Sequence, residues 1–252
     1  MLFSTLSNRC CVPVSVLFSF VVKRRVGSFS KIVRWYRQFW EPKKYLPPYS
    51  HVCQIGDPVL RHEAQPVEAS DICSVRIQKV IHCLREVLLK YDAVGLSAPQ
   101  IGVALQIFIV QFTEAHKRQF TSDTLKLREM TTVPLKVFVN PKMKVLDYER
   151  VVFPEACESI RGFHADVPRY RSVVISGTDE TGRAVSWHAS GWPARIAQHE
   201  MDHLRGRLYS DVMICTSLSC GCWQEVNATG GRLHIPFTPR KGATRLLLRQ
   251  AT

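Results

Sequence analysis

The 252-residue sequence predicts an α+β fold, in which antiparallel sheets pack around a central helix that carries an H-E-x-x-H pattern. Two observations predict this fold class. Two helices are predicted, one before a β-rich middle region by strong apolar periodicity and one after it by proline and glycine at its ends, and two predicted strands are joined by a short turn. Strands joined by short turns, with few helical crossovers, favour an α+β fold over a doubly wound parallel sheet.

The first predicted helix spans residues 70–91. Its apolar side chains, such as Ile77 and Val80, recur at three- and four-residue steps, which is typical of the buried face of an amphipathic helix. Residues 94–102 contain glycine and proline and predict a loop. The β-branched segment 103–110 predicts the strand that follows this loop.

Four further predicted strands are residues 135–140, 145–153, 172–177 and 183–189. The last two flank an Asp-Glu-Thr-Gly turn, so we expect them to form a hairpin. The second helix is predicted to begin near Pro193, because proline suits a first helical turn. It is predicted to end at Gly206, because glycine suits the left-handed position after a helix.

Basic residues gather at the two ends of the chain. The net charge is +13, but residues 1–40 and 232–252 hold twelve of the 34 lysines and arginines and no acidic residue. The remaining 22 basic residues nearly balance the 21 acidic ones. A nearly neutral body argues against a nucleic-acid binder, so we expect no DNA partner.

Residues 1–45 are predicted to be a mitochondrial transit peptide and linker. They are rich in arginine and serine and have no carboxylate before Glu41. A secretory signal or anchor is the alternative, because residues 10–22 are mostly apolar. However, most of the positive charges follow this run, and thirteen residues are too few to span a bilayer. We therefore expect location in the mitochondrial matrix and no stable membrane insertion.

The second helix contains His199-Glu-Met-Asp-His203. Residues four apart project from one helix face, so both imidazoles can bind one metal ion while Glu200 lies beside it. A shuffled chain of this composition would contain only about 0.015 copies of the pattern. The alternative interpretation is a surface helix with two incidental histidines.

A catalytic metal site needs a third protein ligand. The metzincin pattern would place a third histidine where this chain has Tyr209, so that class is excluded. Glu225, downstream, would suit another class of zinc peptidase. Cys157 follows a predicted strand, where a turn could present its thiolate to the helix. From residue types alone, Cys157 and Glu225 both stay open as ligands.

Three segments together resemble the peptide deformylase family, in its animal mitochondrial form. They are Gly95-Leu-Ser-Ala-Pro-Gln-Ile-Gly102, Glu155-Ala-Cys-Glu-Ser159 and Gln198-His-Glu-Met-Asp-His-Leu-Arg-Gly206. The resemblance covers about residues 46–213 and implies hydrolysis of the formyl group from the N-terminal formyl-methionine of newly made, mitochondrially encoded polypeptides, with release of formate. N-formyl-methionyl nascent peptides are the implied partners, and the mitochondrial ribosome is a further candidate.

The resemblance also implies roles for individual residues. Cys157, His199 and His203 match the metal ligands, and Glu200 matches the acid/base that takes a proton from water and gives it to the leaving amine. The side-chain amide of Gln100 and the backbone N–H of Glu158 match the oxyanion donors. The positions that match the substrate channel and the methionine pocket are Gly95, Val94, Phe153, Trp192 and Ile196.

The family is known for ferrous iron, while Zn²⁺, Co²⁺ or Ni²⁺ can occupy such a Cys/His₂ site. One departure is Ala156, where the family usually has glycine; a positive φ there would strain alanine. Residues 214–252 show little resemblance and are predicted to form a mostly disordered basic tail. Two other functions stay open: a zinc metallopeptidase that uses Glu225, and a catalytically lapsed module that binds nascent chains or RNA.

Overall fold

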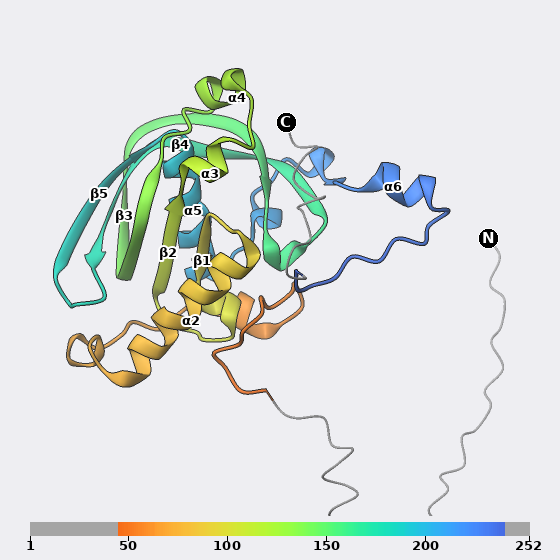
Figure 1. Ribbon diagram of the computed structural model, residues 1–252. Coiled ribbons are helices and arrows are strands. Elements are labelled where there is room, and N and C mark those ends of the chain that lie inside the picture. Colours follow the sequence, from red (N-terminus) through yellow and green to blue (C-terminus); the bar gives the residue numbers. More distant parts are fainter. Residues whose placement is uncertain (1–44, 240–252) are drawn as a thin grey trace, which may run out of the picture. The chain divides into compact units, whose positions relative to one another are not determined.

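The computed structural model describes residues 45–239 (Figure 1). The predicted transit peptide and the last thirteen residues of the basic tail lie outside the described residues, apart from Tyr45. Among the described residues, no helix combines the length and the apolar character that crossing a bilayer requires.

One antiparallel sheet forms the frame of the fold. Its order is β1-β2-β3-β4-β5, and a short strand β6 pairs with β4. The strands are β1 (Gly95–Ser97), β2 (Ile107–Phe112), β3 (Val133–Ala156), β4 (Phe163–Thr178), β5 (Ala184–Ser190) and β6 (Ser219–Cys220). The sheet curves around the helix α5 (Trp192–Leu204), as Figure 1 shows, so the predicted α+β class with a central H-E-x-x-H helix is confirmed.

Helix α5 is buried along most of its length. Ala194 and Ala197 are fully buried among apolar side chains of β2 and β5. Pro193 lies in the first turn, as predicted. Gly206 follows the helix with φ +69°, and a Cβ atom there would lie 2.6 Å from the carbonyl oxygen of Arg61. Both residues therefore mark the ends of the helix as predicted, and at Gly206 the reason is steric.

Helix α2 (Val75–Tyr91) covers another part of the sheet with the predicted apolar stripe. It begins later than residue 70, because Ser74 caps it by accepting a hydrogen bond from the N–H of Ile77. The remaining helical segments are short. They are α3 (Glu114–Lys117), α4 (Ser122–Leu127), α6 (Trp223–Ala228) and the 3₁₀ turns η1 (Pro58–Arg61), η2 (Ala69–Asp71), η3 (Ala98–Ile101), η4 (Glu158–Ile160), η5 (Tyr209–Asp211) and η6 (Cys215–Ser217).

Several predicted boundaries were wrong. Residues 135–140 and 145–153 are parts of the single strand β3, because its register with β4 shifts around Pro141 and lets the strand continue past the proline. The predicted loop 94–102 contains β1 and η3, because Gly95–Ser97 pairs with β2. The predicted hairpin is present as β4 and β5.

The described part of the predicted disordered tail is structured. Residues 215–228 contain η6, β6 and α6, and Cys220 of β6 pairs with Phe163 of β4. Further along, the hydroxyl of Tyr91 donates to the carbonyl oxygen of Phe237 at 3.0 Å. These partners are distant in sequence, so local sequence patterns did not reveal them. The prediction of disorder is therefore wrong for residues 215–228, where these elements lie.

Candidate metal centre

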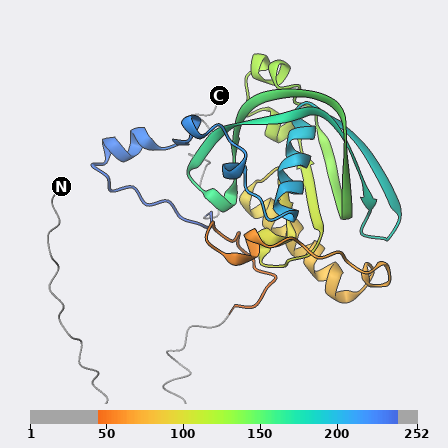
Figure 2. The same ribbon diagram turned by 180° about the vertical axis from the view of Figure 1, so that it is seen from behind.

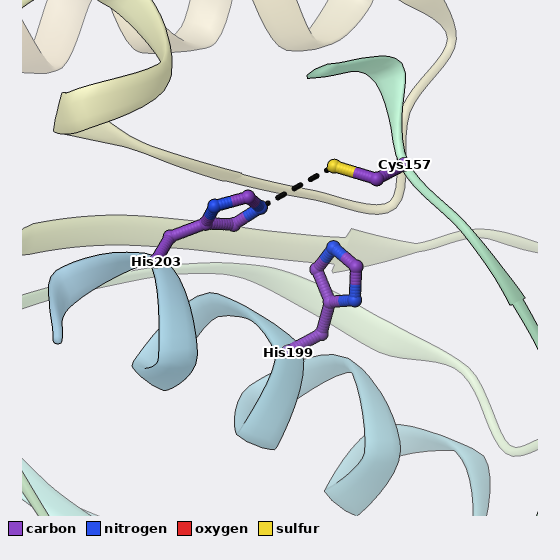
Figure 3. A group of neighbouring side chains, drawn as sticks. All are labelled: Cys157, His199 and His203. Carbon is purple, nitrogen blue, oxygen red and sulfur yellow. Dashed lines mark hydrogen bonds between the residues drawn. The ribbon is translucent and has the colours of Figure 1, made fainter. Parts of the chain in front are cut away.

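Three potential ligands converge at the surface of α5 that faces the end of β3. One ligand atom each from Cys157, His199 and His203 lies within 4.8 Å of the other two (Figure 3). Cys157 Sγ lies 3.4 Å from His203 Nε2. Cys157 follows β3 directly, and the two histidines are one helical turn apart on α5. The thiol of Cys157 and the His203 ring are both buried.

Glu155 fixes the ring of His199. Its Oε2 lies 3.0 Å from His199 Nδ1, which leaves Nε2 for the centre, and Figure 3 shows this nitrogen pointing toward Cys157 and His203. A carboxylate partner of this kind sets the tautomer and orientation of a metal-binding histidine. Sequence reasoning quoted Glu155 within a motif but gave it no role.

Two buried arginines hold Glu155 in turn. Arg169 binds it through two hydrogen bonds of 2.9 and 3.0 Å, and Arg195 Nη1 donates to it at 2.8 Å. Arg169 also pairs with Asp202 on α5. Burial raises the pKa of Glu155, but Arg169 and His199 outweigh it and hold the pKa well below its ordinary value. Glu155 is therefore a carboxylate at neutral pH.

The electrostatics of the centre suit a cation. Burial lowers the pKa of His199, but Cys157 and Glu155 outweigh this effect and raise it well above its ordinary value. Burial and the nearby His199 lower the pKa of His203, so this ring is neutral and can donate a lone pair. A thiol, a neutral imidazole and an imidazole held by a carboxylate form a donor set that fits a divalent transition metal.

Replacing Glu155 with glutamine is expected to weaken metal binding by about 10–100-fold. Glutamine loses the negative charge that orients His199 and neutralises Arg169 and Arg195. The measurement is a competition titration with a metal chelator. Glu149→Gln is the control, because Glu149 is exposed and its ion-pair partner among residues 45–239 is the exposed Arg171. Equal metal affinity in the Glu155 variant and the wild type would contradict this role.

Glu200 lies beside the two histidines in a confined place. It is 3% exposed, and its Oε2 has no hydrogen-bond partner among the described residues. Burial raises its pKa to about 7. The backbone of Gly95 approaches Glu200 so closely that a Cβ atom at residue 95 would lie 2.4 Å from Glu200 Oε1. The match of Gly95 to the family thus has a steric basis in this chain.

Gly95→Ala is expected to reduce the turnover rate by about a hundredfold. The added methyl group must displace the carboxylate of Glu200, and a displacement of a catalytic group by about 1 Å can reduce the rate by this factor. The metal ligands lie elsewhere, so metal content should stay unchanged. Steady-state kinetics with metal analysis of the same samples check this. Wild-type turnover in the variant would show that the position of Glu200 does not matter.

Gln100 is buried with its amide aimed at the centre. Its Oε1 accepts hydrogen bonds from the N–H and hydroxyl of Ser97, which fixes the flip of the amide. Its Nε2 donates to Ser159 Oγ at 3.2 Å and lies 3.6 Å from Cys157 Sγ. Glu158 begins η4 directly after Cys157, and its side chain pairs with Arg161. The backbone of Glu158 thus lies next to the centre.

The structure does not gather the predicted methionine-pocket residues in one cavity. Phe153 and Trp192 line a cavity whose lining does not include the three candidate ligands, whereas Ile196 lies in a hydrophobic cluster against which Val94 and Trp192 pack. Arg128 also lines this cavity, with its guanidinium 5.5 Å from the Phe153 ring centroid and 5.7 Å from that of Trp192. Arg128 follows α4, far from both rings in sequence, so no local pattern indicated it.

Two residues that raised questions in the sequence can now be placed. Ala156 ends β3, pairs with His164, and is not among the described non-glycine residues with positive φ, so the suspected strain is absent. Glu225 lies on α6, which Figures 1 and 2 both place apart from α5. Within the described chain, the candidate metal group consists of Cys157, His199 and His203 without Glu225.

The fold is an antiparallel α+β fold with a central H-E-x-x-H helix. Two histidines of this helix and a cysteine at a strand end form a Cys/His₂ group beside a buried glutamate. This combination defines the class of metal-dependent hydrolases. A sequence profile described as polypeptide deformylase matches residues 49–217. The chain belongs to the polypeptide deformylase family.

Individual relatives agree with this membership. The chain is 46% identical over 197 residues to human mitochondrial peptide deformylase, covering 76% of this chain and 81% of the relative. It is 37% identical over 199 residues to chloroplastic peptide deformylase 1A of Solanum lycopersicum, covering 79% and 71%.

Solved structures show the same fold. A Met-Ala-Ser-bound class I type b peptide deformylase from Acinetobacter baumannii is 26% identical, with a TM-score of 0.57 over 64% of this chain and 96% of that one. A peptide deformylase from Synechococcus elongatus in complex with actinonin is 32% identical, with a TM-score of 0.54 over 69% and 84%.

Proposed function

We propose that this protein is a metal-dependent hydrolase that removes the formyl group from the N-terminal formyl-methionine of newly synthesised, mitochondrially encoded polypeptides and releases formate. The observation that carries the proposal is the convergence of Cys157, His199 and His203 beside the buried carboxyl of Glu200. Family membership supports the same reaction.

One divalent ion would be held by Cys157, His199 and His203. Glu155 would orient the ring of His199 toward this ion. Such an ion supplies a positive charge that polarises the formyl oxygen and acidifies a coordinated water. Ferrous iron is the ion that we favour, because the resemblance to the family points to it. A thiolate with two imidazoles also suits Zn²⁺, Co²⁺ or Ni²⁺.

Glu200 is the proposed general base and general acid. Its raised pKa, about 7, lets the carboxylate accept a proton from water and then return it to the leaving amine near neutral pH. The oxygen of the tetrahedral intermediate carries a negative charge that needs donors placed in advance. The side-chain amide of Gln100 and the backbone N–H of Glu158 would supply them.

The substrate enters with its methionine side chain in an apolar pocket. Phe153, Trp192, Val94 and Ile196 would line this pocket, and Gly95 would line the channel through its backbone. The Acinetobacter relative binds Met-Ala-Ser, a tripeptide that begins with methionine. This supports a site that accepts the N-terminus of a nascent chain.

Location and domain division follow the same proposal. Residues 1–45 direct the chain to the mitochondrial matrix, residues 46–213 form the catalytic domain, and the rest is an appended segment. The human relative named mitochondrial supports this destination. Nascent chains are the substrates, and the mitochondrial ribosome is the partner that presents them.

The test is formate release from a formyl-Met-Ala-Ser peptide by anaerobically purified, metal-loaded protein. Equal amounts of formate and of new free α-amine are expected. A metallopeptidase would instead cleave between residues of the same peptide. Fully metal-loaded protein that releases no formate would refute the proposed function and leave a lapsed binding module as the better explanation.

A further inference from the structure

We propose that Gln54 is a positioning residue that holds the Glu158 peptide in place as an oxyanion donor; this inference rests on the proposed function. Gln54 lies on a short segment without helix or strand structure, residues 52–55, which we call the strut. The strut contacts both segments that supply the proposed oxyanion donors.

The backbone of the strut joins these two segments. Cys53 N–H donates to the carbonyl oxygen of Gln100 at 2.8 Å, and Ile55 N–H donates to that of Ser159 at 2.8 Å. Gln100 and Ser159 are themselves linked, because Gln100 Nε2 donates to Ser159 Oγ. The strut, the Gln100 loop and the Ser159 turn thus form a closed hydrogen-bonded ring.

The strut is anchored on its far side. Val52 N–H donates to the hydroxyl of Tyr91, the last residue of α2, at 3.1 Å, and Val52 is 1% exposed. Because a buried helix end fixes the strut, the strut can impose a position on the turn that it contacts.

Gln54 adds a contact that the backbone of the strut cannot make. Its Nε2 donates to the carbonyl oxygen of Glu158 at 2.8 Å and to that of Val52 at 3.1 Å. The preceding carbonyl, of Cys157, accepts from Ile160 N–H at 3.0 Å. Both peptide groups that flank the Cα of Glu158 are therefore held, and this fixes the direction of the Glu158 N–H.

Gln54 touches no reacting atom, so its removal should change turnover and leave the metal centre intact. Its amide contacts none of the three proposed ligands directly, although the peptide that it holds donates to Cys157 Sγ through the N–H of Ser159 at 3.4 Å. Without the amide donor, the peptide after Glu158, whose own N–H is that of Ser159, gains freedom to rotate. The Glu158 N–H lies in the preceding peptide and loses part of its restraint through the shared Cα of Glu158. A donor that must form its bond in the transition state then acts mainly on kcat.

Two variants test this role. Gln54→Ala removes the donor at every pH, so kcat per bound metal should fall about tenfold at every pH, the loss typical of one hydrogen bond. Gln54→Glu keeps the size and can donate only when protonated. The ratio of its kcat to that of the wild type should be near one at low pH and fall to about one tenth or less as the pH rises and the carboxyl ionises. KM and metal content should be unchanged in both.

A readout without turnover accompanies the kinetics. Amide hydrogen exchange at residues 158–160 should be about tenfold faster in Gln54→Ala, since local opening becomes easier. Gln78→Glu is the matched control. Gln78 Nε2 also donates to two backbone carbonyls, of Ile72 at 2.9 Å and of Glu180 at 2.8 Å, and makes no contact with the centre.

The outcomes separate the two claims. If the wild type is active, two results would overturn the positioning role and leave the proposed function standing. One is a ratio of Gln54→Glu kcat to wild-type kcat that does not change with pH, and the other is an equal loss of kcat in Gln78→Glu. Metal-loaded wild type without formate release would overturn both. A pH-dependent ratio confined to the Gln54 variant, with faster exchange at residues 158–160, would establish the role.

Discussion

Glu200→Gln is expected to reduce formate release by about a thousandfold or more, because general acid–base catalysis by one side chain contributes about 10²–10⁴-fold. Glutamine keeps the size and polarity of the side chain but cannot take a proton from water or return one to the amine. The ligands Cys157, His199 and His203 are untouched, so metal content should match that of the wild type. Formate release per bound metal is the quantity to measure.

Glu225→Gln is the control for this experiment. Glu225 lies on α6, apart from α5, and is not part of the candidate metal group. Its variant should retain wild-type activity and metal. Substantial formate release by Glu200→Gln would contradict the acid–base role of Glu200. A Glu225→Gln enzyme without metal would point to the peptidase interpretation that the sequence left open.

Cys157→Ala is expected to lose stoichiometric metal, with a drop in affinity greater than the roughly 10–100-fold caused by losing an outer-shell partner. Of the candidate group found among the described residues, two imidazoles on one helix then remain, and a catalytic site of this class needs three protein ligands. Formate release should fall with the metal. Elemental analysis after gel filtration gives the metal content, and thermal unfolding shows that the variant is folded.

Cys222→Ala serves as the matched control. Cys222 is also buried, but its neighbour is the sulfur of Cys220 at 3.5 Å, outside the centre. This variant should keep metal and activity. Cys157→Ala protein that still holds one ion per chain would refute the assignment of the thiolate as a ligand.

The sequence predicted the central helix well because local rules determine it. Pro193 and Gly206 mark its ends, and the spacing of His199 and His203 places both rings on one face. Strand β3 was less predictable. Its continuation past Pro141 depends on the register with β4, and that partner is not visible in the local pattern.

The same distinction applies to the centre. The metal ligands were predicted from sequence motifs, because their side chains have characteristic chemistry. The residues that hold these ligands in place are brought to the centre by tertiary contacts. Arg169 and Arg195 reach Glu155 from β4 and α5, and Gln54 reaches Glu158 across 104 positions of the chain. No spacing rule links these residues, so only the folded structure reveals them.

The convergence of one sulfur and two imidazole nitrogens on a single ion is the central claim, and X-ray absorption at the metal edge tests it most directly. For zinc-loaded protein we predict one sulfur at about 2.3 Å and two imidazole nitrogens at about 2.0–2.1 Å, completed by oxygen. A first shell without sulfur, or one unchanged in Cys157→Ala, would contradict the account.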